Sequence, residues 1–250
     1  MIVDNTSKLK DILIFKPNTY YKFVVLLREK DGKQLLQSYN RKELIVKQWL
    51  VDSQEKLDEM LPDMLTYANL FKGRLYVTTD RKSIHKTLFY IQDMINAYIR
   101  QMFNGNRTEI SVKQLNKLLA SASSSSECTD GDKYWLYDVD TKDPNIVDYV
   151  WKHCNYPAPC FETKNGYHII AKRTYDAHKE PLPKEVEVKD NGLALVYYNN
   201  EYWNELLLTG IKAYEKGLKD AVKKKEEAIN DLFPFMNNDP YMQKILKHNL

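Results

Sequence analysis

The chain has 250 residues, of which 43% are hydrophobic and 28% charged, and its formal net charge is +3 at pH 7. This apolar fraction provides a core for one large or two small domains and excludes a wholly disordered chain, and the weak positive charge permits a nucleic-acid partner without indicating one. No apolar stretch approaches the roughly 20 residues of a membrane span, and the polar N-terminus is unlike a signal peptide. The three cysteines are irregularly spaced, unlike those of a disulfide framework. We therefore expect a soluble cytoplasmic protein with no membrane partner.

Strand and helix patterns alternate over residues 1–120, which predicts an N-terminal α/β module. Residues 20–28 and 34–37 flank an Asp-Gly pair and predict a hairpin, and residues 44–51 predict another strand. Ser53 and its acidic neighbours predict the start of a helix that ends near Gly73. A strand over 74–78 follows, then helices over 82–101 and 111–120. The inner face of the helix over 82–101 is predicted to consist of Ile84, Leu88, Ile91, Ile95 and Ile99.

Residues 121–132 are mostly small and polar, which predicts a flexible linker between two modules. The second module, over residues 133–200, is predicted to hold a helix from Asp143 to His153 and strands at 133–140, 160–163, 167–172, 186–189 and 193–198. Residues 201–250 read as a charged helical extension. The predicted fold class is α+β or α/β, with a mixed central sheet, flanking helices and a helical C-terminal tail.

Two carboxylates end the apolar run of the strand over 133–140. Asp138 and Asp140 are two positions apart, and residues at this spacing in a strand project to the same face. Like charges this close repel unless a cation lies between them, and carboxylate oxygens suit Mg²⁺ or Mn²⁺. A solvated strand end with a helix cap explains an isolated Asp-x-Asp pattern equally well.

A second polar motif runs from Lys164 to His168, with the sequence Lys-Asn-Gly-Tyr-His. Gly166 allows a tight turn, and Asn165 also tolerates the left-handed region. His168 begins the next predicted strand, where it can meet a phosphate or position a water. A hairpin that carries a packed histidine is the simpler interpretation of this motif alone.

Together the two motifs resemble those of the archaeo-eukaryotic primase superfamily, the catalytic module of primases and primase-polymerases, in a divergent phage-type form. In that family an acidic strand motif is followed by a turn that ends in Gly-x-His and by a third acid on a later strand. The resemblance covers roughly residues 70–200. It implies that Asp138, Asp140 and a third acid, either Glu187 or Asp190, hold two divalent cations, Mg²⁺ or Mn²⁺.

The same resemblance implies a nucleotidyltransferase that uses nucleoside triphosphates and single-stranded nucleic acid. It implies that His168, with Lys164 and the turn at Gly166, contacts the phosphates of the nucleotide. Three further basic residues are candidates for binding a template or a triphosphate, although ordinary surface charge at a helix start explains each of them: Arg74, Arg81 and Lys82. Two alternatives stay open, a metal-dependent nuclease or phosphohydrolase on the same acids, and a non-catalytic phage-type factor that binds nucleic acid or protein.

Overall fold

The computed structural model describes residues 1–31, 42–105, 112–154, 158–174, 176–179 and 181–201. In chain order its elements, with η for a 3₁₀ helix, are β1 (Ile2–Asp4), η1 (Thr6–Asp11), β2 (Thr19–Arg28), η2 (Glu29–Asp31), β3 (Glu43–Val51), α2 (Gln54–Leu70), β4 (Arg74–Thr78), β5 (Lys82–Ser83), α3 (Ile84–Phe103), α4 (Val112–Ser124), η3 (Ser126–Cys128), β6 (Tyr134–Val139), α5 (Pro144–His153), β7 (Cys160–Glu162), β8 (Tyr167–Lys172), η4 (Ala177–Lys179), β9 (Val186–Asp190) and β10 (Leu193–Asn199). The predicted strand over 34–37 and most of the predicted C-terminal extension over 201–250 lie outside the described residues. None of the described helices is long and apolar enough to cross a bilayer.

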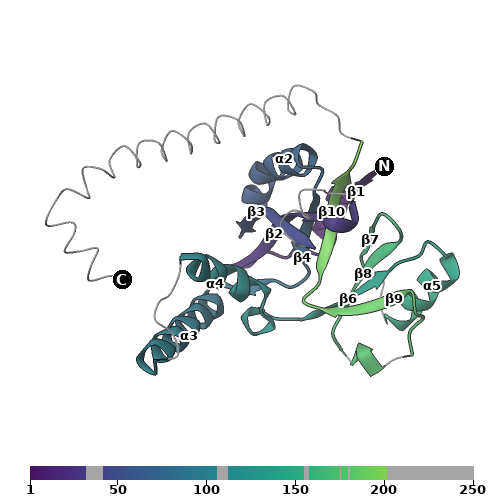
Figure 1. The fold of residues 1–250 in the computed structure, drawn as a ribbon. Helices are drawn as coiled ribbons and strands as arrows, with labels where there is room; N and C mark the ends of the chain where they lie inside the picture. Colours follow the sequence, from purple (N-terminus) through teal and green to yellow (C-terminus); the bar gives the residue numbers. More distant parts are fainter. Residues whose placement is uncertain (32–41, 106–111, 155–157, 175, 180, 202–250) are drawn as a thin grey trace, which may run out of the picture. The chain divides into compact units, whose positions relative to one another are not determined.

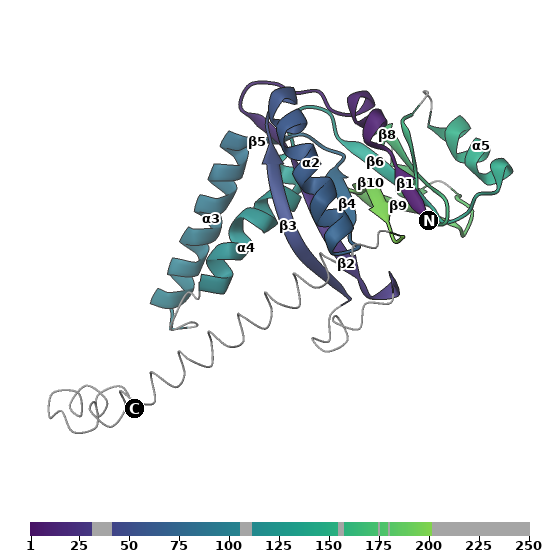
Figure 2. The ribbon, with the colours of Figure 1, turned by 90° about the horizontal axis from the view of Figure 1, so that it is seen from above.

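The larger sheet has six strands: five follow the order β1-β10-β4-β2-β3 (Figure 1), and β5 pairs with the start of β2 (Figure 2). The strands β3 and β4 lie on either side of β2, and each pairs antiparallel with it. The connection through α2 therefore joins two strands that are not neighbours, and it creates no parallel pair. The smaller sheet has the order β7-β8-β6-β9 and is also antiparallel. The described strands therefore form an α+β fold, and the prediction of a mixed sheet is wrong because the crossover skips a strand.

Each sheet has one face covered by a helix. Apolar residues of α2, among them Leu57 and Met64, pack against alternate residues of β2 and β4 such as Phe23 and Leu75. The helix α5 covers the smaller sheet, where Val150 belongs to the same buried cluster as residues of β6 and β8. Because successive side chains of a strand point to opposite faces, every second residue of these strands projects from the face that the helix does not cover.

The chain passes from the smaller sheet to the larger one between β9 and β10. Both strands were predicted, but they do not form a hairpin: β9 pairs with β6, whereas β10 pairs with β4 and β1. Asn191 adopts a positive φ of 50° at this crossing. A Cβ on Gly192 would lie 2.4 Å from the Cβ of Leu136, and the carbonyl of Gly192 accepts a hydrogen bond from the amide of Thr79 at 3.1 Å. The crossing is thus packed against both sheets.

The prediction that residues 121–132 form a flexible linker is wrong. Helix α4 extends to Ser124, η3 follows, and Ala122, Ser123 and Cys128 are fully buried. The small side chains allow close packing. The Ser124 hydroxyl accepts a hydrogen bond at 2.7 Å from Lys22. Burial lowers the pKa of Lys22 to about 8. Residues Met1–Tyr202 form one compact unit, so no module boundary falls at this segment.

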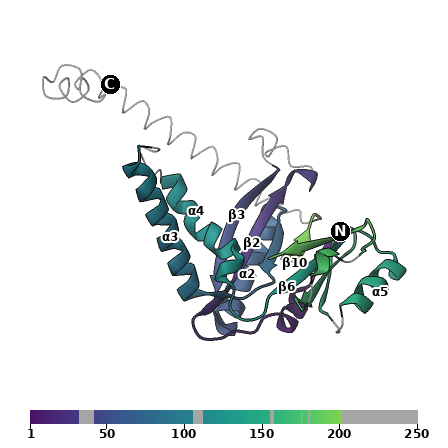
Figure 3. The same cartoon turned by 90° about the horizontal axis from the view of Figure 1, so that it is seen from below.

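Helix α3 lies beside α4 (Figures 2 and 3) and has little other cover. Of its predicted inner face, Leu88 is 59% exposed and Ile99 is 40% exposed, whereas Thr87 is buried. The predicted helix is confirmed, and Ile84, Ile91 and Ile95 are half-buried as expected of its inner face, but the burial expected of Leu88 and Ile99 is wrong. The apolar spacing indicated an amphipathic helix correctly and could not specify how much of that face a neighbour would cover.

Lys82 is 1% exposed and lies where β5, η3 and the crossing after β9 meet. Its ammonium donates to the carbonyl of Ser125 at 3.0 Å and to the hydroxyl of Thr129 at 3.1 Å. Asp80 accepts hydrogen bonds from the same hydroxyl and from the amide of Tyr134. Burial lowers the pKa of Lys82, and the charge of Asp80 opposes that shift. The polar cluster therefore ties the segment after α4 to the larger sheet.

Replacing this buried ammonium should destabilise the fold. In Lys82→Met the acceptors on Ser125 and Thr129 lose their donor, and we expect the free energy of unfolding in urea to fall by about 2–4 kcal/mol. Lys86→Met is the control, because Lys86 is exposed and donates only to the carbonyl of Thr129; it should cost about 1 kcal/mol or less. Equal losses in the two variants would contradict the importance of the Lys82 cluster.

Candidate functional site

Three residues predicted for the site lie in one row across the smaller sheet. In the register of β6, Asp138 faces His168 of β8 on one side and Glu187 of β9 on the other. Side chains directly opposite one another in antiparallel strands project to the same face. The structure therefore brings Asp138, His168 and Glu187 together on the face that α5 does not cover.

The register also separates the two candidates for the third acid. Asp190 faces Trp135, an odd-numbered neighbour of Asp138 whose side chain projects to the opposite face. Its carboxylate lies 3.6 Å from Arg173 and 3.5 Å from His178. Glu187 is thus the acid on the same face as Asp138.

Both ring nitrogens of His168 have partners within the protein. The backbone amide of Leu195 in β10 donates to Nδ1 at 3.1 Å, and Nε2 lies 3.3 Å from Oδ1 of Asp138. Because an amide can only donate, Nδ1 must accept, which assigns the proton to Nε2. His168 then donates to Asp138 and fixes the orientation of its carboxylate.

Lys189 lies beside Asp138 and Glu187, and it was not among the residues predicted from the sequence. We call the sheet face that carries these acids the acidic wall. The Nζ of Lys189 lies 2.5 Å from Oδ2 of Asp138 and 3.0 Å from Oε2 of Glu187. Burial raises the pKa of Asp138, but the hydrogen bonds from His168 and Lys189 and the positive charge of Lys189 outweigh burial and hold that pKa well below its usual range. Burial lowers the pKa of Lys189, and its two carboxylate partners raise it overall. The strand spacing of Glu187 and Lys189 was the available signal, since it places both on one face.

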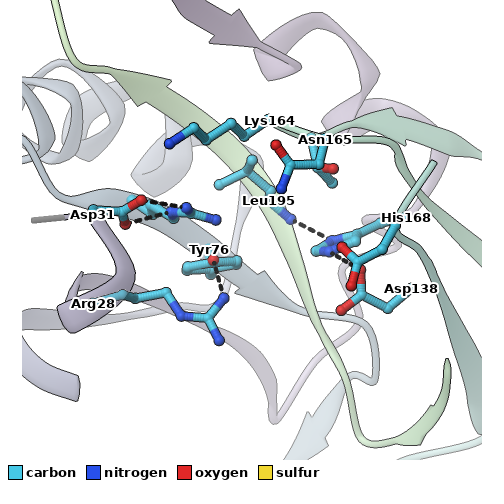
Figure 4. Close-up of a pocket in the computed structure, with 11 residues that line it drawn as sticks. Arg28, Asp31, Tyr76, Asp138, Lys164, Asn165, His168 and Leu195 are labelled. Carbon is cyan, nitrogen blue, oxygen red and sulfur yellow. Dashed lines mark hydrogen bonds and ion pairs between the residues drawn. The ribbon is translucent and has the colours of Figure 1, made fainter. Parts of the chain in front are cut away.

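The facing wall belongs to the larger sheet, and we call it the basic wall for its two arginines, each of which is paired with an acid. Arg74 makes two hydrogen bonds to Asp31, at 2.8 and 2.5 Å, with both side chains almost fully buried. Arg28 lies 2.8 Å from Glu43 and donates to the hydroxyl of Tyr76 at 3.4 Å. Figure 4 shows Arg28, Asp31 and Tyr76 on one side of the pocket, with Asp138 on the other. Of these wall residues, only Arg74 was a candidate from the sequence.

Two adjoining cavities, of about 180 and 390 Å³, separate these walls and share Arg28, Tyr76, Asp138 and His168. The smaller one is also lined by Asp140 and by the turn residues Lys164 and Asn165, and the larger one by Glu187 and Lys189. We call the two together the inter-sheet cleft. Its polar lining and opposed charges suit a ligand that carries both a cation and anionic groups.

The turn after β7 approaches the end of β6 very closely. A Cβ on Gly166 would lie 1.8 Å from the carbonyl oxygen of Val139, so only glycine fits. The amide of Gly166 donates to the hydroxyl of Thr163 at 3.0 Å. Neither Asn165 nor Gly166 has a positive φ, contrary to the conformational reason expected for them. Gly166 serves here to bring the turn against the strand that carries Asp138.

Arg81 and Lys82 are not brought to the cleft. Arg81 donates to Asp130 at 2.7 and 3.0 Å and to the carbonyl of Ile14 at 2.8 Å, and it is 8% exposed. Lys82 is buried in the cluster described above. The expectation that these two residues bind a template or triphosphate therefore fails, because both side chains are engaged inside the fold.

The chain matches no family model, and neither a curated protein nor a solved structure is significantly similar to it.

The donors of the acidic wall fit a divalent cation in kind. Asp138 and Asp140 line one cavity, and the ammonium of Lys189 marks a point where carboxylates of two strands converge on a positive charge. Oxygen donors of this type suit Mg²⁺ or Mn²⁺. Among the residues that the structure describes, however, no group of three or more His, Cys, Asp or Glu side chains surrounds a single point. The fit therefore rests on the donor type of Asp138 and Asp140, which line the same cavity.

The close approach of Gly166 can be tested by adding one methyl group. Gly166→Ala should lower the free energy of unfolding by more than about 3 kcal/mol, because backbone rather than a flexible side chain must move. Gly105→Ala is the control: Gly105 has a φ of +70° but open space around it, so only conformational strain of about 1–2 kcal/mol is expected. A loss for Gly166→Ala no greater than for the control would contradict the packing described.

The lowered pKa of Asp138 predicts a pH-dependent contribution to stability. Because the folded pKa lies below the unfolded value of about 3.9, the stabilisation is complete at neutral pH and decreases as the pH falls below about 5. Urea unfolding of wild type and Asp138→Asn should differ most at pH 7 and converge in acid. Asp148→Asn, an exposed acid paired with Lys152 on α5, should show a much smaller difference at every pH. A constant difference between wild type and Asp138→Asn would show that Asp138 is not held ionised.

Proposed function

We propose that the chain is a metal-dependent nucleotidyltransferase of the primase-polymerase type, which acts in the cytoplasm on nucleoside triphosphates and single-stranded nucleic acid. The observation that carries this proposal is the row of His168, Asp138 and Glu187 on one sheet face, opposite a wall with Arg28 and Arg74. These are the residues of the three motifs that resemble the primase superfamily. The support for the proposal is that these residues of separate motifs share one sheet face beside a cleft.

In this proposal Asp138 and Asp140 hold the divalent cation, which when bound supplies Lewis-acid stabilisation of charge on a phosphoryl oxygen. His168 orients Asp138 through Nε2, and Leu195 fixes that orientation from the larger sheet. Asp138 is available as a ligand because it is ionised at neutral pH. The residues of the chain thus keep the carboxylate charged and directed into the cleft.

The basic wall has the complementary task. Arg28 and Lys164 line the cleft and would neutralise the phosphates of a triphosphate. Arg74 is more buried and is paired with Asp31, so it would act on the phosphates through its electrostatic potential and not by direct contact. Tyr76 offers a hydroxyl between the walls. A metal held by the acids and the arginine of the facing wall would both stabilise the negative charge that develops on a transferred phosphoryl group.

The direct test is an extension assay with single-stranded template, labelled nucleotides and Mn²⁺ or Mg²⁺. Wild type should form metal-dependent products, and Asp138→Asn and Asp140→Asn should each reduce the rate by at least about 100-fold without unfolding. Asp148→Asn on α5 is the matched control and should retain activity. Activity that survives both cleft substitutions would contradict the proposal, and cut strands or released monophosphate in place of extended products would indicate the nuclease or phosphohydrolase alternative.

A second candidate is a non-catalytic binding protein. The observation in its favour is that the charges of the cleft are paired with one another, Asp138 with Lys189 and Arg74 with Asp31. Such a cleft can bind a charged ligand without chemistry. Binding of single-stranded nucleic acid by wild type, unchanged in Asp140→Asn and without any turnover, would favour this candidate.

A further inference from the structure

The ammonium of Lys189 lies between two carboxylates of the acidic wall. It contacts carboxylate oxygens of two strands at once, Oδ2 of Asp138 and Oε2 of Glu187. The Asp138 side chain is 18% exposed, so the negative charge that Lys189 balances is largely removed from water. A carboxylate in this position needs a positive partner, and Lys189 supplies it.

A divalent cation bound to Asp138 cannot share this position with Lys189. His168 contacts Oδ1 of Asp138 and Lys189 contacts Oδ2, so a divalent cation bound at Oδ2 would lie beside the ammonium of Lys189. Two positive charges on the same oxygen repel each other strongly where water is partly excluded. Lys189 is 36% exposed and lines the larger cavity together with Arg28, so its side chain has open space into which it can withdraw.

We propose that Lys189 is a resident cation of the site, which competes with the divalent metal for Asp138 and must leave that carboxylate before the metal binds. This inference rests on the proposed function, because it takes Asp138 to be a metal ligand. It makes Lys189 a residue that sets metal affinity rather than one that holds the metal. It also gives Glu187 a role as the second acid of the pair that Lys189 bridges.

The test is a calorimetric titration of purified proteins with Mn²⁺ alone. Lys189→Met should bind Mn²⁺ at least about tenfold more tightly than wild type, because the competing charge is gone. Lys184→Met is the matched control: it removes the same charge from a side chain that is 91% exposed and lies 3.8 Å from Glu185, so its affinity should stay within about twofold of wild type. Adding Asp138→Asn to Lys189→Met should abolish the gain.

Two further variants guard against misfolding. Lys189→Gln keeps a hydrogen-bond donor without the charge and should show the same gain, whereas Lys189→Arg keeps the charge and should bind Mn²⁺ as weakly as wild type. In thermal unfolding, Mn²⁺ should raise the melting temperature of Lys189→Gln more than that of wild type. Circular dichroism of each variant establishes that the fold is intact.

The outcomes separate this inference from the proposed function. Equal Mn²⁺ affinity in wild type and Lys189→Gln, lost in Asp138→Asn, would overturn the role of Lys189 and leave the metal site standing. Mn²⁺ binding that appears only in the Lys189 variants would support the resident cation and count against a metal-dependent wild-type enzyme. No binding in any variant would overturn both.

Discussion

The chain crosses from one sheet to the other within the short turn at Asn191 and Gly192, and the arrangement of the cleft depends on this crossing. Gly192 packs on Leu136 of the smaller sheet and bonds Thr79 of the larger one. Three residues later the amide of Leu195 meets the ring of His168. A backbone group of one sheet therefore sets the tautomer and orientation of the histidine in the other, and through it the carboxylate of Asp138.

The two walls hold their charges at different depths. Arg74 and Asp31 form a pair with two hydrogen bonds and side chains 8% and 2% exposed, and removing either partner would leave an uncompensated buried charge. Lys189 is more exposed, so water weakens its attraction to the acids and lowers the cost of moving it. The basic wall is thus fixed by its own ion pair, whereas the acidic wall has a counter-ion that can be replaced. A ligand made of a cation and a polyphosphate suits this asymmetry.

The sequence was sufficient to place Asp138, His168 and Glu187 on separate strands of one sheet, because alternation and turn residues are local signals. It could not reveal Arg28, Asp31 and Tyr76 as the facing wall, since these residues precede Asp138 by 110, 107 and 62 positions and belong to the other sheet. Lys189 was within reach of the same alternation that favoured Glu187. The roles in binding nucleotide and metal stay predictions.

The composition of residues 121–132 does not show that this segment is buried, because its burial depends on partners that are distant in the sequence. The small polar residues after α4 looked like a linker, yet Lys22 and Lys82 reach them from β2 and β5. From the sequence, Arg81 and Lys82 were candidates for binding phosphate. In the fold, Arg81 donates to Asp130 and Lys82 donates to Thr129. Long basic side chains can thus order a polar stretch that has little apolar surface of its own.

The most direct test of the account is a crystal structure of the full chain with Mn²⁺ and a non-hydrolysable nucleoside triphosphate, using the anomalous signal of manganese. The account predicts Mn²⁺ at about 2.0–2.2 Å from a carboxylate oxygen of Asp138, the distance usual for a hard six-coordinate cation. It predicts that Lys189 has left that oxygen and that the phosphates face Arg28. Manganese bound elsewhere, with Lys189 still between Asp138 and Glu187, would contradict it.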